Sequence, residues 1–295
     1  MGGAWLPDEV AIRSRLVRLP WGRAFVVDVE PSGSSKGPPL VLLHDLFETS
    51  YAFHSIVPRL ASSRRIIAPD LPGCGDSDHP RPEQVDGYSV AWLGGAVHDL
   101  LAELDVPRVD LLGQGFGASV AIRLAAVHPE LVRRLVLVGP LALTRELPIQ
   151  GAAGLWPVLG AEVFRRVFGR ADLRRVLEQT LSTPELLRAA RLNVYWDRLG
   201  RDGARAATHA MLEQVSHGDG LRSHLDEVYQ RTLVVWGDRD ALVPPEHGER
   251  LVELLADGQL EIVDGCGHAV AEEQSDRLVE LVDEHCGLAR REDVA

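Results

Sequence analysis

The turn at residues 113–117 (Gly-Gln-Gly-Phe-Gly) has the pattern of a catalytic turn, but its central position carries no side chain. An apolar strand ends at Leu112, glycine occupies every second position of the turn, and a helix rich in small residues follows. This pattern predicts a sharp strand-turn-helix, the geometry that lifts a nucleophilic serine above a strand end in the Gly-x-Ser-x-Gly motif. Gly115 stands at the serine position. The sequence therefore predicts a scaffold for an attacking side chain without that side chain.

His268 is the candidate general base. It follows the last predicted strand, at the end of the glycine-rich run 265–268, so its ring can lean over the strand ends toward the turn. An imidazole titrates near neutral pH, which suits it to take a proton from water or from an attacking group. The chain has eleven histidines, and this loop context separates His268 from an ordinary surface histidine.

The absence of a hydroxyl at Gly115 limits the chemistry. No acyl-serine can form, and loss of the serine from a protease triad costs on the order of a millionfold in kcat, so an efficient serine esterase is excluded. Glycine also tolerates the unfavourable backbone angles of such a turn. The turn is then either a packing element kept after catalysis was lost or the product of a deliberate replacement, and both interpretations stay open.

The elements that position these residues alternate in type. Short apolar runs, typical of strands buried on both faces of a parallel sheet, are followed by helical patterns. The predicted strands are 12–19, 24–29, 40–43, 65–68, 109–112, 135–138, 233–236 and 261–263, and the predicted helices include 53–60, 88–104 and 275–285. This alternation predicts the α/β class.

Residues 141–230 break the alternation. They contain no β run, and their helical stretches carry large aromatic side chains. Because strands resume at once with 233–236, the pattern predicts a helical insertion at 141–230 within a core domain formed by residues 1–140 and 231–295. A separate all-helical domain is the less favoured interpretation.

Composition excludes several kinds of partner. The formal net charge is −12 over 295 residues without a long basic run, so we expect no binding of nucleic acid or of an anionic membrane. Cys74, Cys266 and Cys286 lie far apart and lack the spacing of a zinc or redox site. We therefore expect reduced thiols, a cytoplasmic location, and no metal or other cofactor. Neither a signal peptide nor a membrane-spanning run is predicted.

Five motifs, in their order along the chain, resemble those of the α/β-hydrolase superfamily. They are residues 44–49 (His-Asp-Leu-Phe-Glu-Thr), 70–77 (Asp-Leu-Pro-Gly-Cys-Gly-Asp-Ser), 113–117, 237–244 (Gly-Asp-Arg-Asp-Ala-Leu-Val-Pro) and 265–268. The resemblance spans about residues 12 to 286 and is to the branch of small capped esterases, epoxide hydrolases and lactonases. It implies a mostly parallel eight-stranded sheet flanked by helices, with 141–230 as a helical cap.

The resemblance implies roles for residues around the turn. Asp240, three positions after Gly237, stands where the family places the acid that orients the histidine, and Asp238 is the less favoured candidate. The backbone N–H groups of Leu46 and Phe116 are the implied oxyanion donors. The order of the nucleophile position, the acid and the histidine along the chain also matches the family.

Candidate substrate contacts lie near the turn and in the helical insertion. His44 and Gln114 are the candidates near the turn. Trp156, Tyr195 and Trp196 of the insertion would each more commonly be core residues, but together they predict an apolar lid. We therefore expect a hydrophobic small molecule as the ligand.

Asp45 stands where the family has glycine, beside the implied oxyanion donors. A carboxylate directed at those donors would oppose an oxyanion, so the favoured interpretation turns Asp45 away and bonds it to backbone. The alternative places Asp45 in the space left by the missing serine, as a relocated base or nucleophile. Cys74 and Cys266 in rim loops, and Ser119 in the helix beyond the turn, are weaker substitutes.

Three functions fit these residues. The favoured one is an esterase-like enzyme for an apolar ester, lactone or related carbonyl substrate, in which His268 and Asp240 activate water without a covalent step, or move a proton in a lyase reaction. The second is a pseudoenzyme that binds a ligand without turnover. The third is a hydrolase with a relocated nucleophile, Asp45 or a cysteine.

Overall fold

A computed structural model describes residues 13–35, 37–143, 160–217 and 221–287. It contains one eight-stranded sheet in the order β1-β2-β4-β3-β5-β6-β7-β8. The strands are β1 (Arg13–Leu19), β2 (Gly22–Val29), β3 (Leu40–Leu43), β4 (Ile66–Pro69), β5 (Val109–Gln114), β6 (Val132–Val138), β7 (Thr232–Gly237) and β8 (Gly258–Val263). The pairs β1–β2 and β2–β4 are antiparallel and all others are parallel. The predicted fold class, an α/β fold with a mostly parallel eight-stranded sheet, is confirmed.

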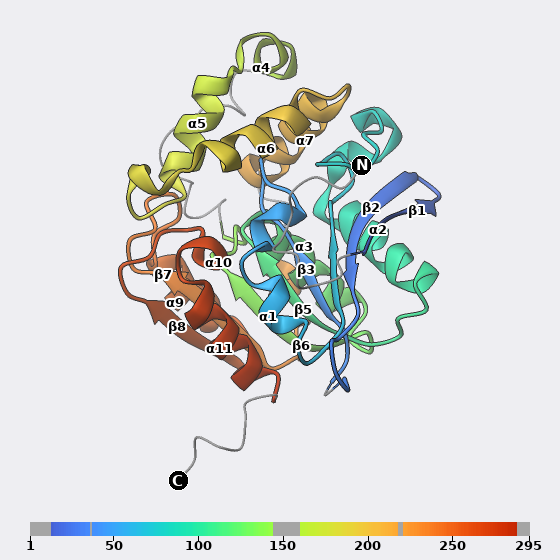
Figure 1. The fold of residues 1–295 in the computed structure, drawn as a ribbon, viewed down its shortest axis with the longest axis vertical. Coiled ribbons are helices and arrows are strands. Elements are labelled where there is room, and N and C mark those ends of the chain that lie inside the picture. Colours follow the sequence, from blue (N-terminus) through green and yellow to red (C-terminus); the bar gives the residue numbers. More distant parts are fainter. Residues whose placement is uncertain (1–12, 36, 144–159, 218–220, 288–295) are drawn as a thin grey trace.

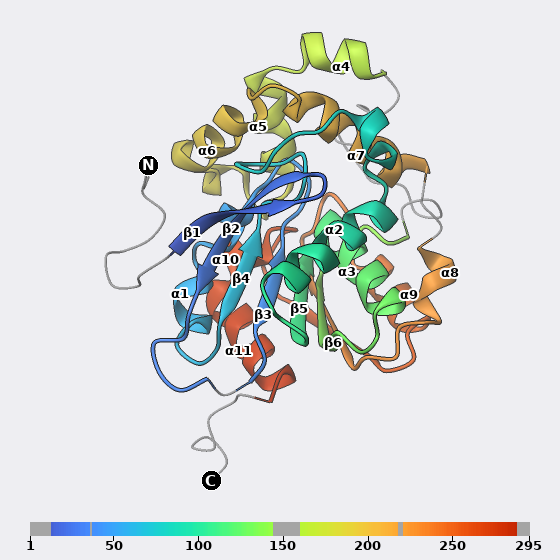
Figure 2. The same cartoon turned by 90° about the vertical axis from the view of Figure 1, so that its right-hand side faces the viewer.

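Helices cover both faces of the sheet (Figures 1 and 2). Strands β3, β5 and β7 are buried along their whole length, as expected for parallel strands packed on both sides. Alternate residues of β3 enter two separate cores: Val41 and Leu43 pack with α2 (Val90–Glu103) and α3 (Phe116–Val127), whereas Leu40 and Leu42 pack with α1 (Val57–Leu60) and α11 (Ser275–His285). The period-two alternation of side chains thus produces the three-layer architecture.

Among the described residues between β6 and β7, five α-helices are found. They are α4 (Ala161–Val167), α5 (Arg170–Gln179), α6 (Ala189–Leu199), α7 (Ala204–His217) and α8 (Arg222–Leu225). Helices α4 to α7, called the helical segment below, lie together beyond one end of the sheet (Figure 1). Arg191 of α6 ion-pairs with Glu48, which follows β3, and with Glu272, which follows β8. The helical segment therefore faces the carboxyl ends of the strands, where ligands bind in open α/β sheets.

The predicted helix at 53–60 is divided in two. A short 3₁₀ helix covers Ser50–Phe53, and α1 begins again at Val57. Pro58 explains the break, because it has no N–H to bond the carbonyl of His54 and its ring crowds that carbonyl in a continuous helix. The predicted helix at 88–104 starts later, at Val90, where the Ser89 hydroxyl accepts the Trp92 N–H.

The cysteines and the lengths of the helices each bear on an expectation drawn from the sequence. Cys74, Cys266 and Cys286 are free and buried, in accord with the expected reduced thiols. Within the described part of the chain, no helix has the length and apolar character needed to cross a bilayer.

Two small helices complete the description of the sheet edge that carries the site. Helix α9 (Glu246–Val252) packs on β7 and β8, and α10 (Val270–Glu273) directly follows the loop that holds His268. Leu251 of α9 joins the core on the α2–α3 face, while Val270 of α10 joins the opposite core. Within the histidine loop itself, Ala269 joins the first of these cores and Cys266 joins the second, so the loop is anchored on both faces of the sheet.

Candidate active site

The predicted sharp turn joins β5 to α3 at Gly115. Gly115 has φ 53° and ψ −115°, a left-handed conformation that side chains strain to adopt, and α3 begins at the next residue. A Cβ at Gly117 would lie within 3.0 Å of the Leu43 carbonyl oxygen, so glycine is needed there for α3 to approach β3. The glycine pattern of the turn thus reflects close backbone packing at the carboxyl end of the sheet.

The Asp45 carboxylate fills the space above Gly115. A Cβ built on Gly115 would fall well inside 3.0 Å of the Asp45 Cγ and of both carboxylate oxygens. Asp45 follows β3, which pairs with β5 in parallel register, so the loops after the two strands meet at the same edge. The chain therefore delivers a carboxyl group from the neighbouring loop to the place where a side chain of the turn would begin.

One oxygen of Asp45 takes both backbone donors of the site. Its Oδ1 accepts the N–H of Leu46 at 2.7 Å and the N–H of Phe116 at 2.6 Å. The favoured interpretation, that Asp45 turns away from the site, is wrong: its backbone partners are the two implied oxyanion donors themselves. The physical reason is that glycine at 115 leaves a vacancy, and unpaired N–H groups at the start of α3 attract an anion.

Asp240 and His268 form a buried pair at the same sheet edge. His268 Nδ1 lies 2.6 Å from Asp240 Oδ2, and both side chains are fully buried. The other oxygen of Asp240 accepts the backbone N–H groups of Leu242 and Val243, each at 2.9 Å. Asp238, the rival acid, instead accepts the Cys266 N–H from an exposed position. The structure thus brings Asp240, and not Asp238, to the imidazole.

The imidazole of His268 lies between two carboxylates. Its Nε2 is 3.2 Å from Asp45 Oδ2, opposite the contact with Asp240. Burial acts to lower the pKa of His268, but the charges and hydrogen bonds of Asp240 and Asp45 outweigh it and hold the pKa well above the ordinary 6.5. The resting site therefore contains an imidazolium that donates one N–H to each carboxylate.

Replacing Asp45 with asparagine is expected to lower the pKa of His268. Loss of a negative neighbour at this distance destabilises the imidazolium, so the pKa of the ring moves down. Because the raised folded-state pKa stabilises the wild-type protein below about pH 6.5 and this contribution is lost as pH rises through that pKa, the variant loses stability mainly at neutral and lower pH. NMR titration of the His268 ring measures the shift, Asp238→Asn is the matched control, and an unchanged midpoint in Asp45→Asn would contradict the ion pair.

His44 positions the loop after β3. Its Nδ1 donates to the Asp45 carbonyl at 2.8 Å, and its Nε2 accepts the Leu71 N–H at 3.0 Å. Burial lowers the pKa of His44, which favours the neutral ring. Both ring nitrogens are used by backbone, so the structure gives His44 a contact with Asp45 in place of the expected contact with substrate.

A buried cluster of charges lies beside the site and was missed from the sequence. Arg191 Nη2 is 2.9 Å from Glu48 Oε1, Arg191 Nε is 2.9 Å from Glu272 Oε1, and Gln114 Nε2 donates to Glu48 Oε2 at 3.1 Å. Burial raises the pKa of Glu48 to about 8 against the opposing charge of Arg191. The sequence around Arg191 carries no signal of this burial, because both carboxylate partners come from other segments of the chain.

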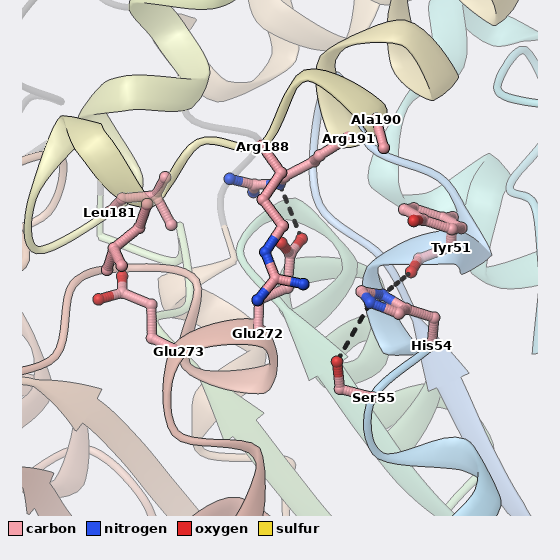
Figure 3. A pocket seen from close by; sticks show the side chains of 10 residues that line it. Tyr51, His54, Ser55, Leu181, Arg188, Ala190, Arg191, Glu272 and Glu273 are labelled. Atoms are coloured by element: carbon pink, nitrogen blue, oxygen red, sulfur yellow. Dashed lines mark hydrogen bonds and ion pairs between the residues drawn. The ribbon is translucent and has the colours of Figure 1, made fainter. Parts of the chain in front are cut away.

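A cavity of about 320 Å³ opens next to this cluster. Figure 3 shows Arg191 of α6 directed at Glu272, with His54 bonded to Ser55 on the facing wall. Arg188, just before α6, also lines the cavity. This lining is largely polar. The expectation of an apolar lid therefore does not describe this part of the boundary between the helical segment and the sheet.

The aromatic residues expected as substrate contacts differ from one another in burial and in their partners. Tyr195 is buried and its hydroxyl donates to Glu272 at 3.4 Å. Trp196 is partly buried, and its ring lies under the Arg205 guanidinium at 5.2 Å. Trp156 lies outside the described residues. Sequence reasoning did not select the aromatic pair of Phe47 and Phe168, whose rings stack at 5.4 Å and join the loop after β3 to the helical segment.

Other candidate nucleophiles are poorly placed. Ser119 is buried within α3. Burial raises the pKa of the Cys74 and Cys266 thiols far above the ordinary value of 9.0, which leaves them almost without thiolate. Over the described ranges, no cluster of histidine, cysteine and carboxylate side chains is arranged to hold a metal ion. Among the substitute nucleophiles named from the sequence, Asp45 is the one that shares a hydrogen bond with His268.

Comparison with known sequences gives a family match over most of the chain. A family profile described as alpha/beta hydrolase fold matches residues 38–275. The chain is 31% identical over 258 residues to a 2-hydroxymuconate semialdehyde hydrolase of a Pseudomonas species, covering 84% of this chain and 87% of that protein. It is 32% identical over 232 residues to a pimeloyl-[acyl-carrier protein] methyl ester esterase of Neisseria meningitidis, covering 77% and 84%.

Solved structures share the fold. Cfl2 from Burkholderia cenocepacia superposes with a TM-score of 0.80 at 28% identity, covering 95% of this chain and 97% of that one. A 2-hydroxy-6-oxo-6-phenylhexa-2,4-dienoate hydrolase from Rhodococcus sp. strain RHA1 also superposes with a TM-score of 0.80, at 21% identity, covering 94% and 99%. The second likeness concerns the fold alone.

Proposed function

Because this chain belongs to the α/β-hydrolase family, we propose that it hydrolyses a small-molecule substrate with His268 as the general base and Asp240 as the residue that orients it. The observation that carries the proposal is the buried 2.6 Å contact between His268 Nδ1 and Asp240 Oδ2 beside the turn at Gly115. Burying an acid and a base costs free energy even when they are paired. A site without a function would have no reason to keep both in the interior. A water molecule activated by His268 supplies the hydrolysing oxygen.

The direct attack of this water on a bound ester has two requirements. The first is that His268 loses the proton that Asp240 and Asp45 hold on its ring, because an imidazolium cannot accept a proton from water. The second concerns the oxyanion. The carbonyl oxygen becomes negative in the transition state, and the N–H groups of Leu46 and Phe116 are the donors that would stabilise it. Asp45 Oδ1 bonds both. The non-covalent route to an ester or lactone therefore requires Asp45 to leave these donors first.

We further propose that the helical segment acts as a cap, with residues 141–230 inserted in a core formed by 1–140 and 231–295. The Phe47–Phe168 stack supports an apolar contact surface between the loop after β3 and the cap. The Arg191 ion pairs add a polar contact between α6 and the carboxyl edge of the sheet. We therefore expect a largely apolar substrate with at least one polar group. The free, buried cysteines favour a reducing compartment such as the cytoplasm.

Removal of the base is the direct test of this function. His268→Ala is expected to lower kcat at least about a thousandfold, because general-base catalysis contributes about 10² to 10⁴ and the variant also loses the contact with Asp45. The measurement is hydrolysis of p-nitrophenyl butyrate, γ-nonalactone, styrene oxide and hexyl bromide. His98→Ala, an exposed histidine on α2, is the matched control and should match wild type. Equal rates in His268→Ala and wild type would contradict the proposal, and so would the absence of wild-type turnover on every probe, which would favour a binder.

A further inference from the structure

We propose that the Asp45 carboxylate is the nucleophile, attacking a saturated carbon that bears a leaving group and forming an ester that water then hydrolyses. The inference rests on the proposed hydrolase function and deepens it by naming the attacking residue and the substrate class. The attacking group then comes from the loop after β3. The turn at Gly115 provides the space for it and, through the Phe116 N–H, one of its hydrogen bonds.

The first observation is that Asp45 occupies the space of a side chain that Gly115 lacks. Gly115 lacks a side chain, and the carboxyl group of Asp45 stands where that side chain would begin. Asp45 is 5% exposed, so its charge is costly unless the surroundings compensate it. The compensation comes from two backbone N–H groups and one imidazolium. The carboxyl group of Asp45 is therefore held by three donors at the centre of the site.

The second observation is that the two oxygens of Asp45 have different partners. Oδ1 accepts short hydrogen bonds of 2.7 Å and 2.6 Å from Leu46 and Phe116, which fix the plane of the carboxyl group. Oδ2 has a longer contact of 3.2 Å with His268 Nε2. One oxygen is thereby anchored, and the other is left to attack with a fixed orientation, which is the geometry a preorganised nucleophile requires.

The first step forms the ester. Asp45 Oδ2 donates an electron pair to the saturated carbon, a new C–O bond forms, and the bond from that carbon to the leaving group breaks. A halide departs with the bonding pair, whereas an epoxide oxygen stays on the product carbon chain and takes a proton from water. Asp45 becomes neutral, so His268 loses one of the two charges that hold its proton and releases that proton to solvent.

The second step hydrolyses the ester. Neutral His268 accepts a proton from water, and the oxygen of that water bonds to Asp45 Cγ. Negative charge then develops on Oδ1, where the Leu46 and Phe116 N–H groups already point. Collapse breaks the bond from Cγ to the alkoxide, which takes the proton back from His268. The regenerated Asp45 carboxyl gives its proton to the imidazole, and the resting ion pair is restored.

The hydrogen bonds from the Leu46 and Phe116 N–H groups to Asp45 determine which class of substrate fits this mechanism. A carbonyl substrate needs the Leu46 and Phe116 N–H groups for its own oxygen, but these groups hold Asp45. Attack at a saturated carbon develops no carbonyl oxyanion in the first step and needs no such donors. The ester formed on Asp45 then carries its own oxygen in the correct place for the second step. Alkyl halides and epoxides share this chemistry.

Trapping the ester tests the inference. In His268→Ala the first step is retained and the second is blocked, so incubation with styrene oxide or hexyl bromide is expected to add the mass of one probe residue to the protein, on the peptide that contains Asp45. The two probes distinguish a substrate that requires protonation of its oxygen from one that does not. The matched control is the double variant Asp45→Asn/His268→Ala, which keeps the shape of the side chain and should gain no mass.

The outcomes separate this inference from the proposed function. An adduct on Asp45 in His268→Ala, together with wild-type turnover of the same probe, supports both. Hydrolysis of p-nitrophenyl butyrate or the lactone that requires His268 but persists in Asp45→Asn, with no adduct from either alkylating probe, overturns the nucleophile and leaves the hydrolase function standing. Absence of wild-type turnover on every probe, with no adduct in His268→Ala, overturns the hydrolase function and the nucleophile with it.

Discussion

Replacing Asp45 with asparagine should nearly abolish hydrolysis while leaving the fold intact. The amide oxygen can still accept the N–H groups of Leu46 and Phe116, so the loop after β3 keeps its anchor, but the amide cannot attack carbon or pair with the imidazolium of His268. Removal of a triad nucleophile costs on the order of a millionfold in kcat in a protease, and we expect a loss of at least about a thousandfold here. The measurement is kcat on the best substrate of the panel, with thermal unfolding to verify the fold.

Asp238→Asn is the matched control for this loss. Asp238 is an exposed carboxylate on the loop that carries Asp240, and its partner is the Cys266 N–H, not His268. An asparagine there can accept the same bond, so kcat should stay within about twofold of wild type, as expected for a substitution outside the site. Wild-type kcat in Asp45→Asn would show that the carboxylate is a packing group.

Restoring serine at the turn alone should destabilise the protein. A Cβ on Gly115 overlaps the Asp45 carboxyl group, and the positive φ of 53° adds backbone strain. Overpacking and strain of this kind each cost about 1 to 3 kcal/mol, so we expect Gly115→Ser to lower the free energy of unfolding by about 3 kcal/mol. The measurement is urea unfolding, combined with labelling by a fluorophosphonate, which we expect to be weak or absent.

The double variant Asp45→Gly/Gly115→Ser removes the overlap. It vacates the Leu46 and Phe116 donors and places a hydroxyl near His268, so we expect recovery of much of the lost stability together with strong fluorophosphonate labelling. The single variant Asp45→Gly is the control and should not label. If Gly115→Ser alone were as stable as wild type and labelled fully, Asp45 would not occupy the position of the missing side chain.

The fold and the turn were predictable because their signals are local. Apolar runs such as 40–43 and 109–112 identify buried strands, and the glycines of 113–117 encode a close approach of α3 to the sheet. Both depend on neighbours along the chain. The helix predicted at 53–60 is divided before Pro58, a break that a proline inside a helical pattern indicates from the sequence alone.

The role of Asp45 was not predictable from its own surroundings. Asp45 and Gly115 each depart from the family pattern, and the sequence offered the filling of the missing serine's space by Asp45 only as the less favoured alternative. They belong together because β3 and β5 are hydrogen-bonded neighbours, with Leu43 opposite Gly113, so the residues that follow them meet. The Asp45 carboxyl group occupies this space because Gly115, 70 positions later, has no side chain. The pairing of β3 with β5 brings the two residues together.

The buried charges of Glu48, Arg191 and Glu272 lay further beyond sequence reasoning. They come from three segments that the fold alone brings together, after β3, in α6 and in α10. A charged residue on a helix is usually solvated, so the sequence gives no reason to expect Arg191 in the interior. The two-sided pairing explains its burial, since an arginine is tolerated inside when carboxylates satisfy it.

Isotope labelling tests the central claim, that Asp45 is covalently involved, most directly. The wild-type protein is allowed to turn over its best probe in water enriched in oxygen-18, and the peptide containing Asp45 is then analysed by mass spectrometry. Hydrolysis of an ester at Cγ leaves oxygen from water in the Asp45 carboxyl group, so we expect heavy oxygen in that peptide after turnover and none without substrate. Heavy oxygen found in the product alone, with Asp45 unlabelled after many turnovers, would contradict the claim.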